Sequence, residues 1–189
     1  IGQGTFTVNI EKYTKLKDLN ISSSIVTSIS LPNASLALLN ITNSAVEGIS
    51  LVNQPFLDRL DFSGCKRLKT VTIDSCDKIT ELNLSNLGDL RTIRITSCPN
   101  LKSIICTNNV NLTTFNVSNC NNVEIINVSR CTNESLTVYI VGVPNIKELN
   151  VSSTNTPNDI QVASSLPNLR ILNISNSQVS AIQYGNAVI

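Results

Sequence analysis

The chain has 189 residues, 14% of them charged, and a formal net charge of +1, so it has no long-range field that would attract nucleic acid or an anionic membrane. It contains no histidine, which excludes every catalytic triad and zinc site that needs imidazole. No stretch approaches the roughly 18 consecutive apolar residues of a membrane span, so we expect no membrane insertion.

Residues 1–15 do not follow the pattern of the rest of the chain, although Phe6 and Val8 indicate one short strand. We therefore expect an N-terminal cap, or the remnant of a preceding segment, at 1–15. A repeat domain is expected at 16–189.

From residue 16 onward, apolar residues recur at a short and nearly constant interval. In the middle of the chain the interval between units stays constant. The four apolar positions Leu57, Leu60, Phe62 and Cys65 of one unit are followed by the equivalent positions Leu68, Val71, Ile73 and Cys76 of the next. The first units are shorter and begin at Leu16, Val26, Leu36 and Val46. The unit reads L-x-x-L-x-L-x-x-C/N and is repeated 16 times.

Each unit alternates apolar and polar residues at its centre, which is the pattern of a short strand with one buried face. Flanking Asn, Ser, Gly and Cys favour turns. No unit is long enough for an amphipathic helix. Since a unit of this length cannot bury a core alone, the units must stack on one another.

The unit resembles the conserved segment of leucine-rich repeats, L-x-x-L-x-L-x-x-N/C-x-L. Two such segments are nested in each coil, an arrangement similar to the short bacterial type, which is found in secreted and cell-surface proteins. The resemblance implies a mainly β solenoid of about eight short coils, with two parallel sheets and little or no helix. The chain departs from the family pattern at the corner, where Cys, Ser and Thr often replace the usual Asn.

The two sheets should present different surfaces. In the odd-numbered units, the outward residue between the two core residues is nearly always asparagine: Asn20, Asn40, Asp61, Asn83, Ile105, Asn127, Asn150 and Asn173. The next outward residue is always Ser or Thr: Ser22, Thr42, Ser63, Ser85, Thr107, Ser129, Ser152 and Ser175. We call the surface formed by these two columns the asparagine face. The even-numbered units show no such order.

Two interpretations of the asparagine face remain open. In the structural one, equivalent Asn, Ser and Thr side chains hydrogen-bond from coil to coil and stabilise the sheet. In the functional one, all of these residues except Ile105 form a flat, uncharged surface that docks a protein partner. We expect the second role: a non-enzymatic recognition or adhesion module at the cell surface or outside the cell.

Other functions are weaker alternatives. The domain could be a structural spacer in a larger surface protein. Ice binding is disfavoured because such faces favour Thr, and glycan binding because outward aromatic platforms are scarce. Asp61 and Asp74 should point out of different sheets, which argues against a glycosidase pair and hence against an enzyme. No cofactor or metal site is expected.

The six cysteines repeat with the unit, and Cys76, Cys98 and Cys120 occupy equivalent positions on consecutive coils. This placement indicates small buried hydrophobic residues, reduced, rather than a disulfide framework. The sheets should also have open edges at the ends of the stack, so end-to-end self-association is expected unless other sequence covers them.

Overall fold

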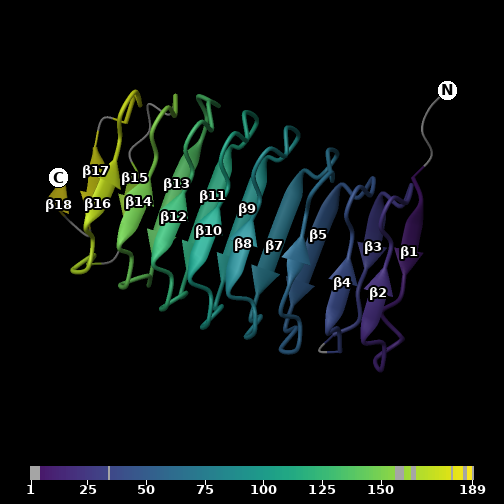
Figure 1. The fold of residues 1–189 in the computed structure, drawn as a ribbon. Helices are drawn as coiled ribbons and strands as arrows, with labels where there is room; N and C mark the ends of the chain where they lie inside the picture. Colours follow the sequence, from purple (N-terminus) through teal and green to yellow (C-terminus); the bar gives the residue numbers. More distant parts are fainter. Residues whose placement is uncertain are drawn as a thin grey trace.

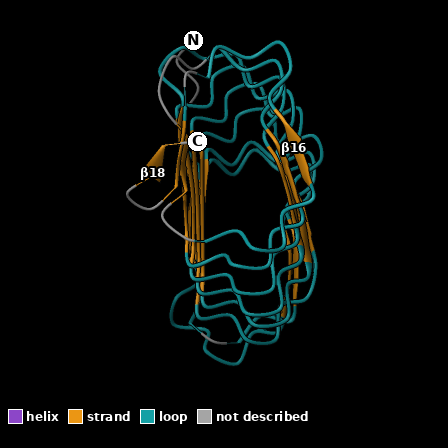
Figure 2. Cartoon of the chain, turned by 90° about the vertical axis from the view of Figure 1, so that its left-hand side faces the viewer, coloured by secondary structure: helices purple, strands orange, loops and turns teal. Residues whose placement is uncertain are grey.

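The computed structural model describes residues 5–33, 35–155, 160–162, 165–179, 181–184 and 187–188. The chain forms an elongated stack of coils that begins at β1 and runs to β16 and β18 at the opposite end (Figure 1). Viewed along the stack, two sheets stand opposite each other and loops join them at both ends of a flattened cross-section (Figure 2). The described residues contain no helix. The mainly β solenoid is therefore confirmed.

The odd-numbered units form the sheet that carries the asparagine face. Its strands are β2 (Asp18–Asn20), β4 (Leu38–Asn40), β6 (Leu60–Asp61), β8 (Glu81–Asn83), β10 (Ser103–Ile105), β12 (Ile125–Asn127), β14 (Glu148–Asn150) and β16 (Ile171–Asn173). They pair in parallel in two groups, β2-β4-β6 and β8-β10-β12-β14-β16. These eight strands, one per coil, agree with the expected number of coils.

The even-numbered units form the opposite sheet. Its strands are β3 (Ser28–Ser30), β5 (Gly48–Val52), β7 (Thr70–Asp74), β9 (Thr92–Thr96), β11 (Thr114–Ser118), β13 (Thr137–Val141), β15 (Ile160–Val162) and β17 (Ile182–Tyr184). Strand β1 (Thr7–Asn9) pairs with β3, and β18 (Ala187–Val188) pairs antiparallel with β17. The separate cap at residues 1–15 stays a prediction.

The core lies between the two sheets and is built from the alternating apolar residues of the repeat. In β8 and the residue after it, Leu82 and Leu84 are buried and Asn83 between them is exposed. Phe62 and Phe115 are the largest fully buried side chains. Each unit buries little alone, so the stacking of equivalent residues supplies most of the hydrophobic stabilisation.

The corners depend on two adjacent residues of the unit. The eighth residue has a positive φ, between 52° and 72°, in each of these units: Ser23, Asn43, Asn53, Gly64, Ser75, Asn86, Ser97, Asn108, Asn119, Arg130, Gly142, Ser153 and Asn176. Asn and Gly tolerate this left-handed conformation better than most residues. The ninth residue is the buried corner residue, at which the chain departs from the family pattern.

Two of the corner thiols make a coil-to-coil hydrogen bond that the usual asparagine would make. The Cys65 thiol donates to the Ile41 carbonyl at 3.0 Å and the Cys131 thiol to the Cys106 carbonyl at 3.2 Å, both on the preceding coil. Asn109, which has the usual residue type, donates to the Leu84 carbonyl at 2.8 Å in the same way. At these three corners, Cys and Asn therefore preserve the same coil-to-coil contact.

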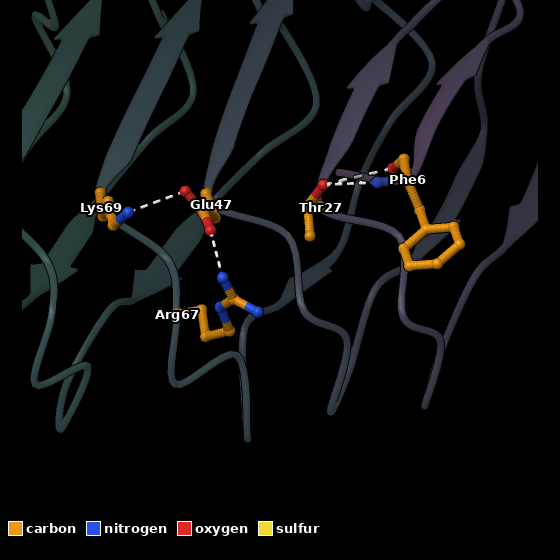
Figure 3. Close-up of polar contacts among 5 residues, drawn as sticks. All are labelled: Phe6, Thr27, Glu47, Arg67 and Lys69. Atoms are coloured by element: carbon orange, nitrogen blue, oxygen red, sulfur yellow. Dashed lines mark hydrogen bonds and ion pairs between the residues drawn. The ribbon is translucent and has the colours of Figure 1, made fainter. Parts of the chain in front are cut away.

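Polar contacts also join the first coils along the edge of the opposite sheet (Figure 3). Glu47 accepts hydrogen bonds from Arg67 at 2.5 Å and Lys69 at 2.7 Å, both on the next coil. The Phe6 N–H donates to the Thr27 hydroxyl at 3.0 Å, which ties the residue before β1 to the residue before β3. Hydrogen bonding to Lys69 and Arg67 lowers the pKa of the Glu47 carboxyl, with Lys69 the larger contributor.

Two residues at core positions of the last asparagine-sheet coil are exposed. Leu172 and Ile174 have 41% and 45% of their surface accessible, whereas the equivalent Leu149 and Val151 on the preceding coil are buried. No described coil lies beyond β16 to cover them. Self-association through this surface stays a prediction.

Candidate functional site

The strand pairing aligns the asparagine column as the sequence predicts. Asn20 pairs with Asn40, and Asn40 with Asp61. Along the second group of strands the register runs from Asn83 through Ile105, Asn127 and Asn150 to Asn173. All eight residues are at least partly exposed, so the column points outward from the core.

The asparagine side chains bond within their own coil, so the structural interpretation is wrong in assigning them hydrogen bonds from coil to coil. In seven coils the side-chain Oδ1 of the first column accepts the backbone N–H two residues later, at 2.8–3.2 Å, from Ser22, Thr42, Ser63, Ser85, Ser129, Ser152 and Ser175. This is an Asx turn, which ends the strand and starts the corner. The regular asparagines thus have a local structural role.

The fifth coil shows what happens without an acceptor in this column. Ile105 has no side-chain oxygen, and the Thr107 N–H and hydroxyl instead contact the Ser85 hydroxyl of the preceding coil, each at 3.2 Å. A coil-to-coil contact in the second column therefore arises where the Asx turn is missing.

The Asx turns also fix what the asparagine face offers to a partner. Because Oδ1 accepts a backbone N–H, the hydrogen-bond network places the amide Nδ2 on the other, outward side. Among the described residues, none of the six Nδ2 groups of this column donates a hydrogen bond, namely those of Asn20, Asn40, Asn83, Asn127, Asn150 and Asn173. The face is therefore a row of amide donors held in one orientation.

The ladder of the asparagine sheet is interrupted between β6 and β8. At the other junctions of this sheet, the eighth unit residue donates its N–H to the seventh residue of the next coil, as Asn86 does to Thr107 at 3.0 Å. In the described part of the chain, Gly64 makes no such bond to Ser85, and β6 does not pair with β8.

A cavity of about 470 Å³ lies at this interruption. It brings together four of the predicted binding residues, Asp61, Ser63, Asn83 and Ser85. Gly64, Lys66, Asn86 and Leu87 also line it, and the sequence reasoning missed them. One sequence feature could have indicated the place, because Leu87 occupies a corner position at which Cys65 and Asn109 donate hydrogen bonds and leucine cannot.

Comparison with known proteins gives the family. Residues 9–186 match the family described as At1g61320/AtMIF1, LRR domain. The chain belongs to this leucine-rich repeat family. No curated protein and no solved structure matches the chain.

Among the described residues, the opposite face of the leucine-rich repeat domain has one Asx turn at the equivalent position, where the Asn9 Oδ1 accepts the Glu11 N–H at 3.1 Å. Its strands β5, β7, β9, β11 and β13 are longer, with five residues each. Its central outward column runs in register from Thr72 through Arg94 and Asn116 to Tyr139. The Asn116 Oδ1 is buried there without a hydrogen-bond partner. This face is less regular, and it provides positions for control substitutions.

The six cysteines of the domain are free and buried. Burial raises the pKa of the Cys76 and Cys131 thiols to about 11, and it raises that of Cys106 as well. Interaction with the neighbouring Cys120 thiol and burial raise the pKa of Cys98, and the same interaction lowers the pKa of Cys120. Buried protonated thiols are poor nucleophiles and poor metal ligands.

The described residues contain no group of three or more Cys, Asp or Glu side chains that could hold a metal ion. They likewise form no helix with the length and apolar character to cross a membrane.

Proposed function

We propose that this domain is a non-catalytic interaction module that docks a protein partner on the asparagine face. Leucine-rich repeat domains generally serve as interaction scaffolds, which supports the coarser part of the proposal. The choice of face rests on one observation, the row of amide donors whose orientation is fixed by Asx turns. Groups that are already ordered lose little entropy when they bind, so they contribute more net affinity.

The chemistry of the face defines the partner. The two columns contain one charged residue, Asp61, and otherwise Asn, Ser, Thr and Ile105. A complementary surface would present acceptors such as backbone carbonyls to the amide donors. With little charge on either side, association should be unsteered and only weakly dependent on salt.

A structural spacer is the second candidate, and the Asx turns favour it as well. Seven turns account for the regular asparagine column by local hydrogen bonding, without any partner. The experiment must therefore separate the turn-forming oxygen from the outward amide.

Asparagine-to-aspartate substitutions make this separation. Asn83→Asp, Asn127→Asp and Asn150→Asp together keep an oxygen that can accept the turn N–H, but they remove three outward amide donors. Each lost hydrogen bond costs about 0.5–1.5 kcal/mol, so binding should weaken by roughly tenfold to a thousandfold.

The matched control carries the same added charge on the opposite face, as Ser50→Asp, Thr72→Asp and Gln161→Asp. Wild type and both variants are compared by surface plasmon resonance against a panel of purified extracellular proteins, with circular dichroism to confirm folding. Binding that is lost only in the asparagine-face variant supports the proposal. Binding that survives in that variant would refute the asparagine face as the docking surface, and no binding by any form would support the spacer.

We further propose that the domain is displayed outside the cytoplasm, as a secreted or cell-surface protein of a bacterial host. Similarity of the short nested repeat to that of bacterial surface proteins supports this location. Fractionation of the native host, with detection by an antibody against the domain, tests it. Protein confined to the cytoplasm would refute it.

A further inference from the structure

One corner of the solenoid differs between its two halves. The position concerned is the residue immediately before each odd-numbered unit. In the last four coils this residue is always asparagine: Asn100, Asn122, Asn145 and Asn168. Each of these side chains donates through Nδ2 to a backbone carbonyl of the preceding coil, at 2.7–3.5 Å. The asparagines therefore close the corner from coil to coil.

In the first four coils the same position holds Lys15, Ser35, Phe56 and Lys78. None of these four side chains makes the equivalent cross-coil bond among the described residues. The corner is open there, and a cavity of about 670 Å³ lies at it, lined by all four residues. This end of the stack is the N-terminal one in Figure 1.

The cavity collects positive charge that is not neutralised by ion pairs. Lys15, Lys17 and Lys78 line it together with one carboxylate, that of Asp58. Among the described residues, the ion pairs involve Arg67, Lys69 and Lys147, and none involves these three lysines. Lys15 and Lys17 line the cavity from the first coil and Lys78 lines it from the fourth, and this excess of amines over a single carboxylate favours an anion.

Two further residues give the cavity the character of a binding site. Ser35 is only 9% exposed, and its hydroxyl is buried without a hydrogen-bond partner in the described structure. A buried polar group without a partner is costly, and a bound ligand that supplied the hydrogen bond would remove that cost. The Phe56 ring is 55% exposed in the cavity wall, where it can pack against an apolar ring.

We propose that this cavity binds a phosphate or sulfate ester carried on an apolar ring. The lysine amines and the Ser35 hydroxyl donate to the oxyanion, Phe56 packs against the ring, and Asp58 accepts from a hydroxyl of the ligand. The cavity volume is in the range of small-molecule sites. The proposal is independent of the asparagine face.

Isothermal titration calorimetry of the domain at low ionic strength tests the proposal with four probes: phenyl phosphate, phenyl sulfate, inorganic phosphate and benzyl alcohol. We expect saturable binding of an aryl ester, at least about tenfold tighter than either inorganic phosphate or benzyl alcohol. The stronger of the two esters identifies the oxyanion. No saturable binding of either ester at millimolar concentration would overturn the proposal.

Variants locate the site. Lys17→Gln should weaken ester binding about tenfold, whereas Lys102→Gln, an exposed lysine outside the cavity, should leave it unchanged. Phe56→Leu should remove the advantage of the aryl ester over inorganic phosphate. Equal effects of the two lysine substitutions would show non-specific charge and refute the site.

Ser35→Ala separates binding from folding. Removing a buried hydroxyl that has no partner should leave the thermal unfolding midpoint unchanged or raised, yet weaken ester binding severalfold. Unchanged ester binding in Ser35→Ala would contradict a hydrogen bond to the ligand.

Discussion

Asn109→Ala tests how far the corner contacts hold the stack together. The Asn109 side chain is fully buried and makes three hydrogen bonds. Its Nδ2 donates to the carbonyls of Leu84 at 2.8 Å and Cys106 at 2.9 Å, and its Oδ1 accepts the Leu87 N–H at 2.9 Å. The Cys106 carbonyl keeps a second donor, the Cys131 thiol at 3.2 Å.

Truncation therefore leaves two buried backbone groups without partners, the Leu84 carbonyl and the Leu87 N–H. Each such group costs about 1–3 kcal/mol, so Asn109→Ala should lower the free energy of unfolding by about 2–6 kcal/mol. Urea unfolding followed by circular dichroism measures the change. Because each coil contacts only its neighbours, a weakened contact in the middle of the stack should let the coils on either side unfold separately, and this would broaden the unfolding transition.

Asn121→Ala is the matched control. Asn121 is exposed, and among the described contacts only its backbone carbonyl accepts a hydrogen bond, so this substitution should change the free energy of unfolding by less than about 0.5 kcal/mol. If Asn109→Ala were as mild as Asn121→Ala, the corner asparagine would not tie the coils together and the reasoning would fail.

Three further predictions concern thiols, charge and glycine. Because burial raises the pKa of Cys76 and Cys131 to about 11, iodoacetamide at pH 8 should label neither thiol in the native protein. In guanidinium it should label both thiols, as measured by mass spectrometry. Rapid labelling of the native protein would contradict the burial. The interactions that lower the pKa of Glu47 stabilise the folded state above pH 4.5, the ordinary pKa of this carboxyl, and their contribution is lost as the pH falls below that value. Glu47→Gln should therefore lose less stability in acid than wild type. Identical acid profiles of the two proteins would count against the ion pairs. Gly64→Ala should destabilise by about 1–2 kcal/mol or more, because φ is +72° there and an added Cβ would overlap the Asn43 Oδ1. Gly88→Ala, where nothing lies within 4 Å of an added Cβ, should be neutral or slightly stabilising in thermal melts, and equal effects of the two substitutions would refute the need for glycine at residue 64.

Much of the fold could be predicted because it repeats. Leu82 and Leu84 recur at equivalent positions in nearly every unit, and this alternation fixes which residues face the core and how the strands align. The outward position of Asn83, Asn127 and Asn150 follows from the same register.

The direction of the hydrogen bonds could not be read from the repeat. An outward asparagine can bond to the next coil or to its own backbone, and both choices have the same periodicity. The Asx turn is favoured because the residue after next, such as Ser85 after Asn83, presents its N–H at the point where the strand ends. Strand ends depend on the left-handed residue that follows, here Asn86, and the periodicity alone does not specify its conformation.

Both cavities lie where the repeat is irregular, and this explains why they were missed. Leu87 replaces a hydrogen-bonding corner residue beside one cavity, and Ser35 and Phe56 replace corner asparagines beside the other. An alignment of units reveals such exceptions as substitutions, but only the three-dimensional structure shows that space opens beside them.

Photo-crosslinking tests the central claim most directly. A photoreactive amino acid in place of Ile105 lies on the asparagine face at the one coil without an Asx turn to lose, and one in place of Tyr139 lies on the opposite face. With a partner identified by the binding panel, the account predicts crosslinks from position 105 and none from position 139. Crosslinks from position 139 alone would contradict it and place the interaction on the opposite face.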